Sequence, residues 1–141
     1  MKLLVPMDGS GAATRALKQA IALARLGAGG SIHLVHAHEE PRIFGEIAVY
    51  VPREKMESLQ REHSEAILAP AEAEVSSAGV PCTKEVLRGP IAQTIARHAG
   101  HLGCDAIVMG RHGRTPLGDV LVGSTAMKVL HASSLPVMLV R

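Results

Sequence analysis

Short apolar runs alternate along the chain with longer segments in which apolar residues recur every three or four positions. Apolar runs bounded by turn-forming residues predict buried strands at residues 2–7, 32–37, 82–87, 106–109 and 135–140. Helical spacing or composition predicts helices at residues 12–26, about 53–78, 90–100 and 124–132. Strands that alternate with helices in this way predict one α/β domain, with a parallel sheet covered on both faces.

Two segments depart from this regular pattern. Residues 38–52 mix charges, two prolines and the two aromatic residues of the chain, Phe44 and Tyr50, so we expect a flexible loop or flap there. Pro70 falls inside the long helix predicted at 53–78. Because proline lacks an N–H and clashes with the preceding turn, we expect it to kink or break that helix.

Composition narrows the classes of function. Lys and Arg total 15 against 13 Asp and Glu, which gives a formal charge of +2, and aromatic residues make up only 1% of the chain. This charge is too small for a dedicated nucleic-acid binder, and few side chains could stack on bases. No apolar run approaches the ~18 residues of a membrane span. We therefore expect neither nucleic acid nor a membrane as a partner.

Cysteines and histidines give little sign of a metal or redox centre. Cys82 and Cys104 both fall at predicted strand starts, where small buried residues in a reducing cytoplasm are the simpler interpretation. We place His33, His36 and His38 on one face of the strand at 32–37, which would suit a metal on paper. A complete coordination shell is not evident, so we favour a core or rim role and assign no metal site.

The stretch from Ala106 to Thr125 carries the strongest chemical signal. An apolar strand leads into the pattern Gly110-x2-Gly113-x9-Gly123-Ser124, after which a helix begins. Glycine lets an anion approach backbone amides closely, and the first turn of a helix offers unpaired N–H groups and a positive dipole end. A strand, a glycine loop and a helix start in this order predict a phosphate-binding site.

Other nucleotide motifs fit the chain poorly. Gly9-Ser10-Gly11 resembles the start of a dinucleotide fingerprint, but the third glycine is replaced by Thr14 and Asp8 intrudes before the loop. The G-x4-G-K-[ST] string of a P-loop is missing. No serine-histidine-aspartate order or CxxC pair indicates nucleophilic or redox catalysis, so no catalytic residue is assigned.

The glycine pattern, GRHGRTPLGDVLVGST, resembles the ATP-binding signature of the universal stress protein family. The opening KLLVPMDGS, the central LRGPIAQTI and the closing SSLPVMLVR agree with it, so the resemblance covers residues 1–141 as one domain. It implies a three-layer, Rossmann-like fold of the adenine nucleotide alpha-hydrolase type, with a five-stranded parallel sheet in the order 3-2-1-4-5. That order would bring Asp8 and Gly110 to neighbouring strand ends.

The resemblance also implies a ligand and its contacts. The ligand would be ATP or AMP, with Mg²⁺ expected beside ATP. Pro6 and Ala37 would lie near the adenine, Met7 and Met109 would add apolar packing, and Asp8 would either contact the ribose or a metal or simply cap the next turn. Arg111 and His112 lie within the glycine loop, where a cation would offset phosphate charge. Phosphates would be held by the amides of Gly110, Gly113, Gly123 and Ser124, with Thr125 beside them at the helix start.

The function implied is a cytoplasmic, nucleotide-dependent regulatory module of the stress response rather than an enzyme. Two alternatives stay open: a slow ATP-hydrolysing or phosphotransfer enzyme, and an interaction protein that does not bind nucleotide. The apolar final strand, residues 135–140, would lie at a sheet edge by the same resemblance. Because exposed edges tend to pair, we expect a homodimer through this strand.

Overall fold

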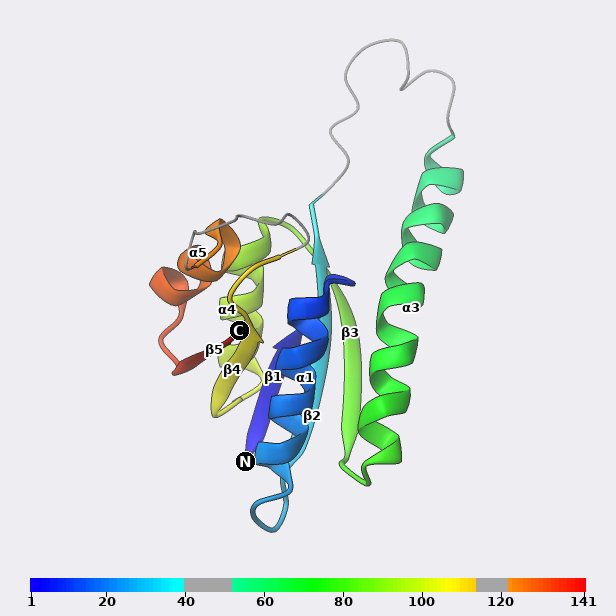
Figure 1. The fold of residues 1–141 in the computed structure, drawn as a ribbon. Helices are drawn as coiled ribbons and strands as arrows, with labels where there is room; N and C mark the ends of the chain where they lie inside the picture. The colour runs from blue at the N-terminus through cyan, green and yellow to red at the C-terminus, as the bar shows by residue number, and fades with distance from the viewer. Residues whose placement is uncertain (40–51, 114–121) are drawn as a thin grey trace.

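A computed structural model describes residues 1–39, 52–113 and 122–141, within which strands and helices alternate (Figure 1). The strands are β1 (Lys2–Pro6), β2 (Ser31–His38), β3 (Cys82–Arg88), β4 (Ala106–Gly110) and β5 (Val137–Val140). The helices are α1 (Gly11–Ala24), α3 (Arg53–Ser77), α4 (Ile91–His101) and α5 (Ser124–Ala132). Each strand and helix predicted from the sequence is present, with ends that coincide with the prediction or differ from it by at most two residues.

The strands form one parallel sheet in the order β3-β2-β1-β4-β5. This confirms the predicted α/β fold and the strand order that the family resemblance implied. β1 pairs with β4 in a register that sets Leu3 opposite Ala106 and Leu4 opposite Ile107. Since parallel strands end at the same edge, the segment after Pro6 emerges beside Gly110.

Two aliphatic cores lie on opposite faces of the sheet. On one face, Leu3, Val5 and Leu34 of the sheet pack against buried residues of α1 and α3. On the other face, Leu4 and Val35 pack against buried residues of α4 and α5. The result is the three-layer arrangement visible in Figure 1, with helices covering both sides.

The turn between β1 and α1 shows how the sequence starts a helix beside a strand end. Gly9 has a φ of 81°, a conformation that residues with a Cβ rarely adopt. The Ser10 side chain then caps α1, because its Oγ accepts a hydrogen bond from the Ala13 amide at 3.1 Å. Serine is among the residues preferred at this position.

Pro70 does not break α3, which runs from Arg53 to Ser77 with the proline inside it. The predicted break is therefore wrong, whereas the alternative, a kink at Pro70, stays a prediction. Pro70 is exposed, whereas Leu68 and Ala71 on either side of it are buried against the sheet. Packing of this apolar stripe offsets the hydrogen bond that the proline cannot donate.

The predicted flap at 38–52 lies mostly outside the described residues. His38 belongs to β2 rather than to a loop, and α3 begins at Arg53, directly after Pro52. Residues 114–121 of the glycine-rich stretch are also outside the described part of the chain. Among the helices that the structure describes, none combines the length and apolar character that a membrane crossing requires.

Candidate functional site

A cavity of about 430 Å³ opens at the edge where the strands end. This volume falls within the range of about 300–1,000 Å³ that is typical of small-molecule sites. Its walls come from the ends of β1, β2 and β4 and the starts of α1 and α5, with contributions from α3 and α4. The lining residues are Pro6, Met7, Asp8, Ala13, His36, Ala37, His38, Glu39, Gln60, His63, Ile91, Ile95, Met109, Gly110, His112, Gly113, Gly123, Ser124, Thr125 and Ala126.

Asp8 serves the turn that follows it and also faces the glycine loop. Its Oδ1 accepts a hydrogen bond from the Ser10 amide at 2.9 Å, so the carboxylate stabilises the start of α1. Its Oδ2 would lie 3.4 Å from a Cβ placed on Gly113. One carboxylate oxygen is therefore occupied by the turn before α1, while the other lies close to Gly113, and both residues line the cavity.

The first turn of α5 presents backbone amides at the cavity. Its N-cap is Gly123, in an extended conformation (φ −72°, ψ 163°), a residue that has no side chain with which to cap the helix. Its carbonyl accepts a hydrogen bond from the Met127 amide at 3.0 Å. The amides of Ser124, Thr125 and Ala126 precede the first intrahelical hydrogen bond, at the positive end of the helix dipole.

The amide of Gly123 is already engaged, although the sequence had assigned it to phosphate. It donates to the carbonyl of Arg111 at 2.6 Å, while the Arg111 amide donates to the carbonyl of Val140 at 2.9 Å. The backbone of Arg111 thus fastens the start of α5 to the ends of β4 and β5. Of the residues predicted to touch the ligand, Arg111 is the one absent from the described cavity wall.

Three histidines that the sequence had not assigned to the ligand also line the cavity. His36 is buried, and its Nδ1–H donates to the carbonyl of Met7 at 2.8 Å, which leaves Nε2 as an acceptor in the neutral ring. The ring centroids of His38 and His63 lie 6.2 Å and 5.7 Å from that of His36. His63 belongs to α3, so its place beside His36 and His38 depends on how that helix packs and could not be predicted from the spacing of the histidines.

Burial is the main reason that the pKa of His36 is lowered. The neighbouring His63 and His38 lower this pKa further, whereas the hydrogen bond to Met7 and the nearby Asp8 raise it. The ring is therefore neutral near pH 7. A neutral ring contributes a hydrogen-bond acceptor to the cavity rather than a positive charge.

The expectation that His33, His36 and His38 share one face of β2 is wrong. Side chains alternate along a strand, so residue 33 faces the opposite side from residues 36 and 38. The ring of His36 meets His63 of α3, whereas that of His33 meets His98 of α4, on the other side of the sheet.

Known proteins resemble this chain in sequence along its whole length. The sequence matches the model of the Universal stress protein family over residues 1–141. The chain belongs to the universal stress protein family. Its curated relatives include universal stress protein YxiE of Bacillus subtilis, which is 30% identical over 99% of this chain and 98% of its own length. A universal stress protein of Thermus aquaticus is 35% identical over 99% of this chain and 97% of its own length.

Solved structures of universal stress proteins share the fold. The structure of MJ0577, a protein of Methanocaldococcus jannaschii, superposes with a TM-score of 0.85 at 29% identity, over 99% of this chain and 94% of that one. UspA from Lactobacillus plantarum gives a TM-score of 0.83 at 23% identity, over 100% and 97% of the two chains.

The fold brings the predicted contacts of this universal stress protein together at one cavity. All of the residues that the sequence had assigned to the ligand, apart from Arg111, line it. They come from strand ends and a helix start far apart in the sequence. The pairing of β1 with both β2 and β4 makes the strand ends neighbours, and the hydrogen bond from Gly123 to Arg111 brings the start of α5 beside them. The cavity also includes Ile91 and Ile95 of α4, which were not among the predicted contacts.

Proposed function

We propose that this universal stress protein binds an adenine nucleotide, ATP or AMP, in the cavity and acts as a nucleotide-dependent regulatory module of the stress response. The observation that carries the proposal is the first turn of α5, which follows Gly123 as its N-cap and opens onto a cavity of ligand size beside Asp8. Backbone amides at a helix start bind phosphate through both hydrogen bonds and the helix dipole.

The cavity has a chemically distinct wall for each part of a nucleotide. Pro6, Met7 and Ala37, at the ends of β1 and β2, would contact the adenine, and Asp8 would accept hydrogen bonds from ribose hydroxyls. The amides of Gly113, Ser124 and Thr125 would hold phosphates. Mg²⁺ would accompany ATP and neutralise part of its charge.

Ligands bound to two solved universal stress proteins with this fold support an adenine nucleotide as the ligand. One solved universal stress protein, with a TM-score of 0.70 at 20% identity, is described in complex with cAMP. Another, from Archaeoglobus fulgidus, with a TM-score of 0.70 at 23% identity, is described in complex with dAMP. Both ligands are adenine nucleotides, the class that the cavity of this chain would take.

Native mass spectrometry of the protein as purified, followed by calorimetric titration with ATP, AMP and GTP, tests the proposal. We expect an adenine nucleotide to bind and GTP to bind more weakly. If no adenine nucleotide binds at millimolar concentration, the chain is an interaction protein without a nucleotide, and the proposal fails.

A matched pair of substitutions isolates the backbone amide at the start of α5. Ser124→Pro removes this amide, and proline is tolerated at the first position of a helix. The extended conformation of Gly123 also suits a residue that precedes proline. Ser124→Ala removes only the hydroxyl group. Since a charge-assisted hydrogen bond contributes about 1.5–3 kcal/mol, we expect Ser124→Pro to weaken ATP binding about 10–100-fold.

We propose a regulatory role rather than catalysis for this site. The described residues that line the cavity include several histidines but no Lys or Arg that could stabilise a transferring phosphoryl group. We therefore expect ATP turnover well below about 1 s⁻¹, the low end for ordinary enzymes. Turnover above that value, lost in Asp8→Ala and Ser124→Ala, would establish the enzymatic alternative.

We also propose that the protein is a cytoplasmic homodimer paired through its last strand. β5 lies at one edge of the sheet, and Met138 within it is 41% exposed. Met127 and Leu130 of α5 add further exposed apolar surface. Unpaired strand edges bind other strands, and a second copy of the same edge can pair antiparallel across a two-fold axis. Both cysteines are free thiols, which suits a reducing compartment.

A further inference from the structure

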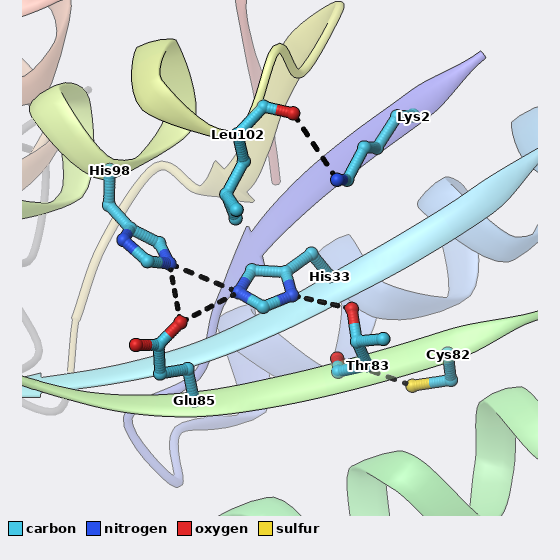
Figure 2. A network of polar contacts seen from close by, with 7 residues as sticks. All are labelled: Lys2, His33, Cys82, Thr83, Glu85, His98 and Leu102. Atoms are coloured by element: carbon cyan, nitrogen blue, oxygen red, sulfur yellow. Dashed lines mark hydrogen bonds and ion pairs between the residues drawn. The ribbon is translucent and has the colours of Figure 1, made fainter.

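A cluster of potential metal ligands lies on the α4 side of the sheet, away from the nucleotide cavity. His33 of β2, Glu85 of β3 and His98 of α4 point toward one another in Figure 2. None of the three lines the cavity described above. Across the described residues, this is the group of three or more candidate ligands whose donor atoms converge.

The distances between the three donor atoms match those around a single tetrahedral ion. Nε2 of His33 lies 3.2 Å from Nε2 of His98 and 3.7 Å from Oε2 of Glu85. Nε2 of His98 lies 2.9 Å from the same Oε2. A tetrahedral zinc ion with bonds of about 2.0–2.1 Å sets its ligand atoms about 3.3–3.4 Å apart. The observed separations lie on both sides of this value.

We propose that His33, Glu85 and His98 bind one zinc ion. Two imidazoles and one carboxylate form a known zinc ligand set, and a water molecule completes the tetrahedron. The Glu85 side chain is 50% exposed, so an ion and its water can reach the site from solvent. Hard cations such as Mg²⁺ and Ca²⁺ prefer oxygen ligands and fit this donor set poorly.

A neighbouring hydroxyl group orients the most buried ligand. Nδ1 of His33 lies 2.6 Å from Oγ1 of Thr83, which can accept a hydrogen bond from the ring N–H (Figure 2). With the proton on Nδ1, the lone pair of Nε2 points at the other two ligands. Metal-bound histidines almost always have such a partner on their second nitrogen.

The ion would link β2, β3 and α4, of which β3 buries little apolar surface. β3 is an edge strand, and of its residues Cys82–Arg88 only Leu87 is buried. A zinc ion would tie the edge strand β3 and helix α4 to β2, which lies inside the sheet between β3 and β1. His98 also lies one helical turn beyond Ile95, a residue of the cavity wall, so the ion would fix the position of that wall.

Zinc titration of the chelator-treated protein, in buffer without nucleotide or phosphate, tests the site. We expect about one ion per chain, and a zinc-dependent rise in the melting temperature because the ion binds the folded state. Cobalt(II) in place of zinc should give the visible absorption of a four-coordinate ion. Mg²⁺ at the same concentration should not raise the melting temperature.

Substitutions separate this site from zinc adsorbed by scattered histidines. His98→Gln and Glu85→Gln should each weaken zinc binding by at least about tenfold, and Thr83→Val by about 10–100-fold. His101→Gln is the matched control, because His101 is exposed on the same helix and outside the cluster. It should leave zinc affinity unchanged. Glu85 is largely exposed, so its variant keeps the test valid if the histidine variant folds poorly.

Two results would overturn the proposal. One is the failure of the wild-type protein to bind zinc in a defined ratio. The other is an equal loss of affinity in His98→Gln and His101→Gln, which would mean that the cluster is a hydrogen-bonded group without a metal. Nucleotide binding is measured separately and does not enter either result.

Discussion

Gly110 lies directly against Ala12, so closely that a Cβ at position 110 would come within 2.7 Å of the Ala12 Cβ and 2.9 Å of its carbonyl carbon. The missing side chain therefore lets the first turn of α1 pack onto the end of β4. The sequence analysis had attributed this glycine to the approach of a ligand, but the structure shows that the fold itself requires it.

Gly110→Ala should consequently destabilise the protein. Two of the three closest atoms belong to the backbone, so rotation of a side chain cannot relieve the overlap. Overpacking of this kind costs about 1–3 kcal/mol. Urea unfolding measures the change. Gly113→Ala is the control, since among the described residues the nearest atom to its Cβ would be the Asp8 Oδ2 at 3.4 Å, an ordinary contact. Equal stability of the two variants would contradict this explanation of Gly110.

Substitution of Asp8 can separate its role in the fold from its proposed role in binding. Asp8→Asn keeps an oxygen that can accept from the Ser10 amide, so the turn and the stability should be preserved. Asp8→Ala should lose about 0.5–1.5 kcal/mol of stability, the value of a typical hydrogen bond. Both variants should bind ATP more weakly, because the carboxylate charge is gone. Unchanged ATP affinity in Asp8→Asn would restrict this residue to the turn.

The lowered pKa of His36 predicts a dependence of stability on pH. Protonation is disfavoured in the folded state by burial and by His63 and His38, against the opposing effects of Asp8 and the Met7 carbonyl. The unfolded chain takes up a proton as the pH falls below about 6.5, while the folded ring resists it. Stability is therefore full above this pH and is lost as the pH falls toward the folded-state pKa.

Urea unfolding between about pH 5 and 8 checks this dependence. The contribution of one histidine cannot exceed about 1.4 kcal/mol per pH unit. His36→Asn keeps an N–H for the Met7 carbonyl but cannot titrate, so its stability should decline less steeply than that of the wild type at acid pH. A slope identical to that of the wild type would mean that His36 does not titrate in this way.

The proposed homodimer depends on an apolar edge, so a charge there should abolish it. Met138→Lys places an ammonium on β5, and lysine is a common means by which natural proteins block edge pairing. Light scattering should report a dimer for the wild type and a monomer for the variant. Leu26→Lys is the control, because Leu26 is 81% exposed and lies outside β5. A monomeric wild type at micromolar concentration would rule out the dimer.

The periodicity of the sequence was sufficient to predict the elements and the α/β class, but not the order of the strands. Apolar runs such as Ala106–Met109 identify buried strands without saying which strands are neighbours. The contact between the ends of β1 and β4 depended on the family resemblance, and the register of Leu4 with Ile107 now shows it directly. Pro70 was misjudged because local propensity ignores the packing of Leu68 and Ala71.

The cluster of His33, Glu85 and His98 could not be found from sequence spacing. Its members lie on three different elements, and the contact requires the register that sets His33 beside Thr83, together with the packing of α4. The histidines of β2 offered a simpler signal that was misread. Their positions along a strand put His33 on one face and His36 on the other, which alternation alone could have indicated.

The two edges of the sheet are held by different forces. On β3, Lys84 forms ion pairs with Glu65 and Glu72 of α3, at 2.8 Å and 3.3 Å, and the strand buries little apolar surface. On β5, apolar side chains predominate. Chloride salts screen exposed ion pairs, whereas sulfate strengthens apolar burial. Chloride should therefore weaken the attachment of β3, whereas sulfate should strengthen that of β5. Amide hydrogen exchange of the two strands would show which one opens more readily in each salt.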